Sequence, residues 1–225
     1  MTDAVFLDRD GVINQLVFYP DLGLIDSPLN PTEFKLIPGA AEAIKTFNRL
    51  GLKVIVVSNQ PGIAKGKMSM ELFEEIRQKM KRLLAKNGAY LDGEYYCLHH
   101  PEAKRLELKV KCRCRKPQPG LILKAAKELG VKTSKSYMIG DGLTDIKAGQ
   151  AVGCKSILIG TIKCDLCRLM ETMAVKPDII ATSLLHASKI IEKEMSENKE
   201  IFVDTANNEE IEIEKNGEKV RQEFV

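Results

Sequence analysis

Two carboxylates, Asp8 and Asp10, stand two residues apart directly after the apolar run Ala4–Leu7. That run is too short for a helix and too apolar for a loop, so it predicts a buried parallel strand. Carboxylates are costly to place near a core unless a cation holds them together, and that arrangement is a common basis of phosphoryl chemistry. Taken alone, the pair is also compatible with a solvated Asp-x-Asp loop.

Two other predicted strands end in polar residues in the same way. The β-branched run 54–57 leads into a polar cluster that begins at Ser58, and the run 137–139 is followed within two residues by Asp141. Ligands of doubly wound sheets bind beyond the carboxyl ends of the strands. We therefore expect the two clusters to converge with Asp8 at one edge of a sheet.

The residue types at this edge suit phosphoryl transfer. A carboxylate can attack phosphorus and form an aspartyl phosphate, which makes Asp8 the candidate nucleophile. Asp10 could protonate the leaving oxygen and later activate water. Asp141 could complete an oxygen-ligand Mg²⁺ site with Asp8. The hydroxyl of Ser58 and the backbone N–H groups of residues 59–62 could donate to the phosphoryl oxygens.

A second set of residues has the spacing of a metal site. Cys97 and His99 form one ligand pair, and Cys112 and Cys114 form another, with twelve residues between the pairs. Three thiols and one imidazole predict a closed, structural Zn²⁺ site that staples the loop 97–114. Three free thiols and a surface histidine are the alternative, which the pairing disfavours. His100 stands one residue beyond the spacing of the first ligand pair and is interpreted as a neighbour of the site or a surface residue.

Two cations follow the zinc staple directly. Lys116 offers a point charge, and Arg115 offers a planar fork suited to bidentate phosphate contacts. Either residue alone would be read as a solvated surface charge. Their position between the metal ligands and Pro117 favours a role in phosphate binding.

Helices and strands alternate along the chain at short spacing. The predicted strands are 4–7, 54–57, 95–98, 137–139, 156–159 and 178–180, and the predicted helices are 38–50, 69–86, 119–129, 145–151 and 183–195. Parallel neighbours need helical crossovers, so this order predicts an α/β fold with a doubly wound, Rossmann-like and mostly parallel sheet that has helices on both faces.

The domain organisation follows from the same pattern. We expect one domain over residues 1–195 and a charged tail over 196–225, which forms a small hairpin at Asn216-Gly217 or a mobile appendage. The segment 11–32 is rich in turn residues and is predicted to be irregular. A loop of that length is often functional, and it could act as a lid.

Composition excludes several classes of protein. The 225 residues hold 34 Lys and Arg against 31 Asp and Glu, a net charge of +3 that is no nucleic-acid signature. No apolar run approaches the roughly 20 residues of a membrane span. The first strand begins at once, so we expect a cytoplasmic protein whose cysteines are thiols or metal ligands. Cys164 and Cys167 form a C-x-x-C pair without a second ligand pair and are interpreted as ordinary thiols.

The motifs that carry this chemistry resemble those of the haloacid dehalogenase-superfamily phosphatases. FLDRDGVIN, VIVVSNQPGIAKG, CRKPQPG and GDGLTDI match the four superfamily motifs in order and spacing over residues 3–160. FLDRDG together with the two zinc pairs is similar to the group of D-glycero-D-manno-heptose 1,7-bisphosphate phosphatases and histidinol-phosphatases, which lacks a large cap domain. The sequence departs from the heptose enzymes in three places: Gly142 follows Asp141 where they carry a lysine, residues 15–18 lack their more polar run although Tyr19 matches, and the loop to Phe34 is longer than theirs.

The resemblance implies a Mg²⁺-dependent phosphatase that acts on a small sugar phosphate, with heptose bisphosphate as the first candidate substrate and histidinol phosphate as the second. Zinc would be structural. The implied roles are Asp8 as nucleophile, Asp10 as general acid and base, Ser58 and Lys116 as phosphoryl stabilisers, Tyr19, Asn59, Gln60 and Arg115 as substrate contacts, Asp8, the backbone carbonyl of Asp10 and Asp141 as Mg²⁺ ligands, and Cys97, His99, Cys112 and Cys114 as Zn²⁺ ligands.

A zinc-stapled nucleic-acid-binding module is the alternative from another class. The segment 104–116 is basic, but Glu102 and Glu107 compensate it and no stacking aromatic residues interleave it. Salt-dependent oligonucleotide binding without phosphatase activity would favour this alternative. Our expected partner is a small phosphorylated metabolite, without nucleic acid or membrane, and the expected state is a monomer. A 3′-phosphatase that acts on DNA ends lies between the two hypotheses.

Overall fold

The computed structural model describes residues 2–20, 23–160, 174–206, 214–215 and 218–219. The chain divides into two units, Met1–Ile190 and Ile191–Val225, and each is described by itself.

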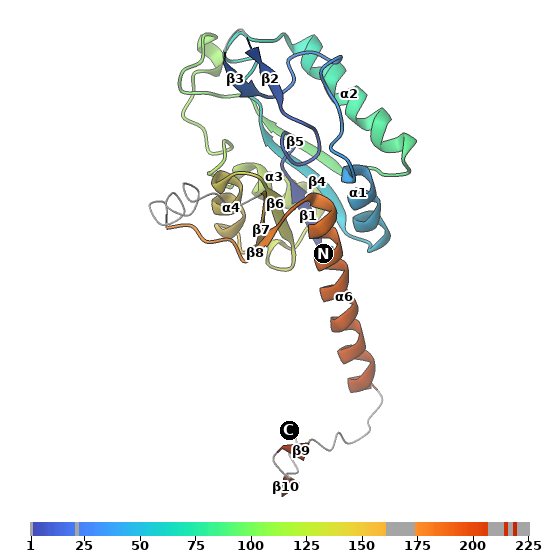
Figure 1. The fold of residues 1–225 in the computed structure, drawn as a ribbon. Helices are drawn as coiled ribbons and strands as arrows, with labels where there is room; N and C mark the ends of the chain where they lie inside the picture. The colour runs from blue at the N-terminus through green and yellow to red at the C-terminus, as the bar shows by residue number, and fades with distance from the viewer. Residues whose placement is uncertain (1, 21–22, 161–173, 207–213, 216–217, 220–225) are drawn as a thin grey trace. The chain divides into compact units, whose positions relative to one another are not determined.

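The first unit is built on a sheet of six strands (Figure 1). These are β1 (Ala4–Leu7), β4 (Lys53–Asn59), β5 (Gly93–Cys97), β6 (Tyr137–Gly140), β7 (Lys155–Ile159) and β8 (Ile179–Ala181). Their order is β5-β4-β1-β6-β7-β8, and every neighbouring pair is parallel. In chain order, β4 and β5 are added on one side of β1, and β6, β7 and β8 are then added on its other side. The sheet thus reverses its direction of growth between β1 and β6, where sheets of this class bind their ligands.

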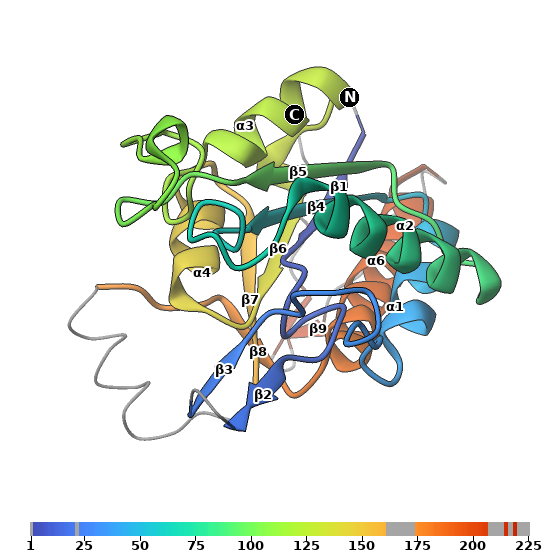
Figure 2. The ribbon, with the colours of Figure 1, turned by 90° about the horizontal axis from the view of Figure 1, so that it is seen from above.

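Helices cover both faces of the sheet. The helices are α1 (Ala40–Arg49), α2 (Met70–Lys86), α3 (Gly120–Leu129), α4 (Leu143–Gln150) and α6 (Leu184–Ala206), and the short 3₁₀ turns are η2 (Leu106–Leu108) and η3 (Thr133–Lys135). Figure 2 shows α1 and α2 on one face and α3 and α4 on the other. The predicted doubly wound α/β class is confirmed.

Local sequence explains where the helices begin and which side they bury. Ser69 is the N-cap of α2, and its hydroxyl accepts a hydrogen bond of 3.2 Å from the Leu72 N–H. Helix α3 ends at Gly130, whose φ of 65° is the left-handed conformation that glycine favours. In α1 the buried residues follow helical spacing, and they are Ala40, Ala43, Ile44 and Phe47.

The central strands are buried on both faces. All four residues of β1 have no exposed surface, and neither do residues 54–57 of β4. Strands buried on both sides show no polar alternation, which is why their sequences read as continuous apolar runs. Phe6, Ile55 and Met138 pack in one core cluster with side chains of α3 and α4. The strand ends that carry the polar residues are therefore held by a rigid core.

The segment 11–32 is more ordered than predicted. It contains β2 (Val17–Tyr19) and β3 (Leu24–Asp26), which pair antiparallel. The prediction of an irregular loop was wrong because each strand has only three residues, too few to give an alternating pattern. Phe18 and Ile25 face each other across the pair and are exposed by 62% and 66%.

In the second unit, β9 (Glu214–Lys215) and β10 (Glu218–Lys219) pair antiparallel. The predicted turn between them, Asn216-Gly217, lies outside the described residues, as do Cys164 and Cys167. The assignment of residues 196–225 as a separate tail stays a prediction. Within the part of the chain that the structure describes, no helix combines the length and the apolar character needed to cross a membrane.

Candidate functional site

Three carboxylates gather where β1 and β6 end. Asp8 follows β1, Asp141 follows β6, and Asp145 lies in the first turn of α4. Each offers one carboxylate oxygen, and these oxygens all lie within 4.8 Å of one another. The Asp8 N–H also donates to the Ile139 carbonyl over 3.0 Å, which joins the two strand ends. The structure thus brings Asp8 and Asp141 together as the strand-end argument predicts, and it adds Asp145.

The loops that follow β1 and β6 approach each other closely at Gly11. Its φ is +78°, and a Cβ at this position would lie 2.1 Å from Oδ2 of Asp141. Any side chain here would therefore be strained and would also push the carboxylate of Asp141 away. Asp145 is fixed from the other side, because the Gly142 N–H donates to its Oδ2 over 3.1 Å.

Negative charge exceeds positive charge in the carboxylate cluster. Burial of the carboxyl group, and then repulsion by Asp8 and Asp145, raise the pKa of Asp141 to about 7, although the residue as a whole is exposed. Burial also raises the pKa of Asp145 to about 6, with Lys116 acting against the rise and Asp8 adding to it. A divalent cation with oxygen ligands would relieve this repulsion, so the donor set fits Mg²⁺.

Lys116 is the cation that faces this cluster. It is only 3% exposed, and its Nζ lies 2.9 Å from Oδ1 of Asp8 and 2.5 Å from Oδ1 of Asp145. The same Nζ donates to the Val57 carbonyl over 2.8 Å. Burial alone would lower the pKa of Lys116, but the two carboxylates outweigh burial and raise it. Lys116 therefore stays charged and holds one oxygen of Asp8.

Asn59 fixes the main chain of Lys116. Its Oδ1 accepts from the Lys116 N–H over 3.0 Å, and its Nδ2 donates to the Lys116 carbonyl over 3.1 Å. The side-chain amide is thus occupied by two bonds to the protein. Arg115, the next residue back, donates from Nη1 to the His99 carbonyl over 3.2 Å. Substrate contacts of Asn59 and Arg115 stay predictions.

Asp10 is not among the clustered carboxylates and is bound by buried hydrogen-bond donors. Its Oδ1 accepts from Arg9 Nη2 and Asn14 Nδ2, each over 2.9 Å, and its Oδ2 accepts from Gln60 Nε2 over 2.5 Å. Gln60 Nε2 also lies 3.1 Å from the hydroxyl of Ser58, to which it donates. The candidate acid and base is therefore linked through Gln60 to a candidate phosphoryl stabiliser. Gln60 itself is 2% exposed.

The four predicted zinc ligands lie together at the end of β5 and in the loop that follows. The sulfur of Cys97 is 3.6 Å from that of Cys112 and 3.3 Å from that of Cys114, and Nδ1 of His99 is 3.3 Å from the Cys114 sulfur. Ligands around a tetrahedral Zn²⁺ with bonds of about 2.3 Å are separated by about 3.8 Å. The donor types and spacings fit a Cys₃His zinc site.

His100 is not part of that cluster. It is buried, its Nδ1 accepts from the Glu102 N–H over 3.0 Å, and its own N–H donates to the Leu108 carbonyl over 3.1 Å. Of the two interpretations that the sequence leaves open for His100, burial excludes the surface residue, and the neighbour of the zinc cluster stays a prediction. Its two hydrogen bonds join buried His100 to Glu102 and Leu108 of the loop 97–114.

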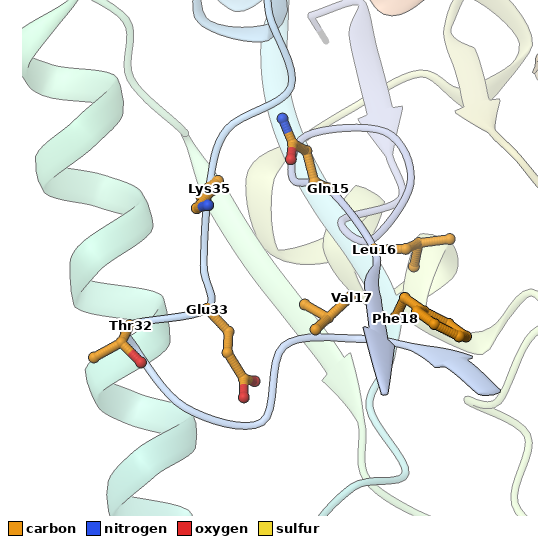
Figure 3. A pocket seen from close by; sticks show the side chains of 7 residues that line it. All are labelled: Gln15, Leu16, Val17, Phe18, Thr32, Glu33 and Lys35. Carbon is orange, nitrogen blue, oxygen red and sulfur yellow. The ribbon is translucent and has the colours of Figure 1, made fainter. Parts of the chain in front are cut away.

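A cavity of about 400 Å³ opens beside the β2–β3 pair (Figure 3). Residues 15–18 line one side, and Thr32, Glu33 and Lys35 line the other. Figure 3 shows Val17 turned toward Glu33, with Leu16 and Phe18 on the opposite side of the strand. Gln15, the first lining residue, follows Asn14 in the chain, and Asn14 donates to Asp10.

Tyr19 lies in the same β2–β3 pair. Its hydroxyl donates to Oε2 of Glu33 over 2.7 Å, and burial together with this carboxylate raises the pKa of Tyr19. The hydroxyl is thus committed to bonds inside the segment 17–33. Contact of Tyr19 with a substrate stays a prediction.

Sequence reasoning missed Arg9, Asn14 and Asp145. Asp145 stands four residues after Asp141, one helical turn along the fourth motif, and that spacing was the available signal. Arg9 stands between two carboxylates, which signals a charge partner but not a buried one. Nothing in its type marks Asn14 as a partner of Asp10.

Comparison with known proteins gives a consistent result. A family model described as HAD-hydrolase-like matches residues 113–187. The D-glycero-beta-D-manno-heptose-1,7-bisphosphate 7-phosphatase of Haemophilus influenzae is 40% identical over 164 residues, which cover 72% of this chain and 84% of that protein. The protein of the same name from Escherichia coli K12 is 41% identical over 162 residues, 71% of this chain and 80% of that one.

A solved structure agrees with these relatives. The D,D-heptose 1,7-bisphosphate phosphatase from B. bronchiseptica, complexed with magnesium and phosphate, superposes with a TM-score of 0.71 at 27% identity. The match covers 86% of this chain and 99% of that chain.

Proposed function

The chain belongs to the haloacid dehalogenase-like phosphatases, in the family of the heptose-1,7-bisphosphate 7-phosphatases, and from this premise we propose that it hydrolyses the 7-phosphate of D-glycero-β-D-manno-heptose 1,7-bisphosphate. It is a phosphoric monoester hydrolase. One observation carries the assignment of its chemistry: Asp8 stands at the point where the sheet reverses, bound to Lys116 and within reach of two further carboxylates.

In the first step, an oxygen of Asp8 attacks phosphorus and the bond between phosphorus and the sugar oxygen breaks. Oδ1 of Asp8 is held by Lys116 Nζ at 2.9 Å and by the Arg9 N–H at 2.7 Å. Oδ2 is then the oxygen left for the attack. Asp10 gives its proton to the departing sugar oxygen.

In the second step, water hydrolyses the aspartyl phosphate. The Asp10 carboxylate takes a proton from the water while the water oxygen attacks phosphorus, and the bond to Asp8 breaks to release inorganic phosphate. Ser58 and the backbone N–H groups of residues 59–62 would donate to the phosphoryl oxygens in both steps.

Two metals complete the proposed site. Asp8, Asp141 and Asp145, with the backbone carbonyl of Asp10, would hold Mg²⁺, which neutralises charge on the phosphoryl oxygens when it is bound. The Cys₃His cluster would hold Zn²⁺ as a structural ion. Its four ligands would complete a tetrahedral Zn²⁺ site, and Lys116 follows the last of them by two residues.

The sugar would occupy the cavity bordered by residues 15–18, with Tyr19 and Arg115 as further contacts. Arg115 has one donor on the His99 carbonyl, and its other guanidinium N–H groups, for which the described part of the chain shows no acceptor, would meet an anion. The second phosphate of a bisphosphate substrate would lie within hydrogen-bonding reach of the Arg115 guanidinium.

The test is phosphate release from a panel of phosphorylated metabolites in the presence of Mg²⁺. The wild-type protein should hydrolyse the heptose bisphosphate, and Asp8→Asn should abolish release while zinc content stays at one ion per chain. Asp3→Asn, which changes a carboxylate on the other end of β1, is the matched control and should keep activity. Turnover retained in Asp8→Asn would refute the mechanism, and preferential hydrolysis of histidinol phosphate would replace the substrate. A monomeric state and the absence of nucleic-acid binding stay predictions.

A further inference from the structure

Arg9 is a fully buried cation. None of its surface is exposed, and its guanidinium lies 6.0 Å from the ring centre of Phe73. A charged group is tolerated in a core only if bonds replace its water. Arg9 obtains such bonds through Nε and Nη2: Nε lies 3.2 Å and Nη2 2.9 Å from Oδ1 of Asp10, and Oε1 of Gln60 accepts from Nη2 over 2.8 Å. Its Nη1 is buried without a hydrogen-bond partner among the described residues.

These bonds determine the orientation of Asp10. The side chain of Asp10 is 13% exposed, and both of its oxygens accept from buried donors of Arg9, Asn14 and Gln60. A guanidinium is a rigid planar fork, so a carboxylate that it binds through two nitrogens takes a defined plane. Protein groups, more than water, thus fix where the acidic oxygens of Asp10 point.

The same guanidinium orders Gln60. Because Oε1 of Gln60 accepts from Arg9, the NH₂ end of the amide must face the other way. That end meets Oδ2 of Asp10 at 2.5 Å and the hydroxyl of Ser58 at 3.1 Å. Reversal of the amide would place Nε2 against the Arg9 donors. Arg9 therefore fixes the orientation of the Asp10 carboxylate. It also fixes the orientation of the Gln60 amide, which donates to Ser58.

We propose that Arg9 is a positioning residue for proton transfer, which acts by holding Asp10 and Gln60 in the geometry that serves the leaving oxygen and the attacking water. The proposal rests on the proposed function, because it assigns Asp10 the role of acid and base. A merely structural Arg9 would affect the fraction of folded protein and not the dependence on the leaving group.

The leaving group separates these two roles. An alkoxide needs a proton as it departs, whereas 2,4-dinitrophenolate leaves without one. For Arg9→Met, kcat/KM toward a primary alkyl phosphate should fall about 100-fold, the scale of general acid catalysis, and kcat/KM toward 2,4-dinitrophenyl phosphate should fall only a few-fold. Water attack on the aspartyl phosphate still needs Asp10, so that step becomes slow. Rapid mixing with the dinitrophenyl ester should then show a burst of one dinitrophenolate per active chain.

Three further variants control the experiment. Arg77→Met removes a different arginine, which is partly buried, is bonded to Glu94 and lies over the ring of Tyr96 at 5.4 Å, and it should show neither the dependence on the leaving group nor the burst. Arg9→Lys keeps the charge and should recover part of the lost activity toward the alkyl ester. If Arg9→Met does not fold, Gln60→Leu can be used instead, because it removes the other side chain that holds Asp10. It should give the same difference between the two esters and the same burst.

The outcomes distinguish the proposal from its premise. Equal losses toward both esters without a burst, in Arg9→Met and in Gln60→Leu, would overturn the positioning role while leaving the phosphatase assignment intact. No hydrolysis of any alkyl phosphate by the wild-type protein would instead overturn the proposed function.

Discussion

Cys114→Ser tests whether the zinc staple delivers Lys116 to the active site. Cys114 lies 3.3 Å from both the Cys97 sulfur and Nδ1 of His99, so this change removes one corner of the ligand cluster with little change in volume. We expect zinc content to fall well below one ion per chain. Lys116 follows two residues later, and phosphate release should fall at least about 10-fold, since the cation that holds Asp8 would lose its anchor.

The size of the effect on the loop can be worked out from its length. Cys97 and Cys112 bound a segment of 16 residues (112 − 97 + 1). Cross-linking the ends of a segment of about 15 residues stabilises the closed state by about 3 kcal/mol in the chain-entropy model. Since each 1.4 kcal/mol is about a tenfold change in population, the open loop should become about 100-fold more populated. Some backbone bonds would remain, including that of the Lys104 N–H to the Ala64 carbonyl at 2.8 Å.

Trypsin reports on the open state. The loop carries exposed cleavage residues at Lys104, Arg105, Lys109 and Lys111. Their cleavage rate should rise about 100-fold in Cys114→Ser when opening is fast relative to cleavage. Cys154→Ala changes a buried thiol outside the cluster and should keep zinc, activity and resistance to trypsin. A Cys114→Ser protein that loses its zinc yet resists trypsin as the wild type does would refute the staple.

Three further predictions concern the carboxylate cluster. Gly11→Ala places a Cβ 2.1 Å from Asp141 Oδ2 at a φ of +78°, so it should cost about 1–3 kcal/mol of stability in denaturant unfolding and most of the Mg²⁺-dependent activity; wild-type activity would contradict it. Asp145→Asn should weaken Mg²⁺ binding at least about 10-fold by calorimetry, and unchanged affinity would remove Asp145 from the ligand set. Burial and nearby carboxylates raise the pKa of Asp141 from 3.8 to about 7, so the stability of the metal-free protein should decline as the pH rises from about 4 to about 7. Mg²⁺ should therefore raise the melting temperature more at about pH 8 than at about pH 5, and equal shifts would count against this reasoning.

The sheet was predictable because burial on both faces leaves a simple pattern. The run 54–57 is β-branched and apolar without alternation, and it forms the centre of β4, which extends to Lys53–Asn59. The pair β2–β3 was not predictable in the same way. Strands of three residues show too little periodicity, and their pairing depends on how the segment lies against the rest of the domain.

The candidate site likewise contains residues that the sequence could place and residues that it could not. Asp8 and Asp141 could be placed together because the end of a parallel strand fixes the position of the next residue. Asp145 was not placed there, because α4 was predicted to begin at Asp145 and instead begins at Leu143. The side chain of Asp145 therefore points back from the first turn toward Lys116. Arg9 was missed because arginine is rarely buried, and its sequence neighbours do not reveal on which side of the strand its side chain lies.

The charges of the site suggest the order in which it is filled. Among the described residues, Lys116 pairs with Asp8 and Asp145, so these two carboxylates, Asp141 and Lys116 together carry a formal charge of −3 + 1 = −2 when all four are ionised. Asp10 adds nothing, because Arg9 balances it within the core. A phosphate ester that approached this cluster would be repelled, whereas a divalent cation would bring the charge to zero. The metal is therefore best regarded as part of the substrate site, present before the phosphate enters, and Lys116 as the group that keeps Asp8 oriented in the meantime.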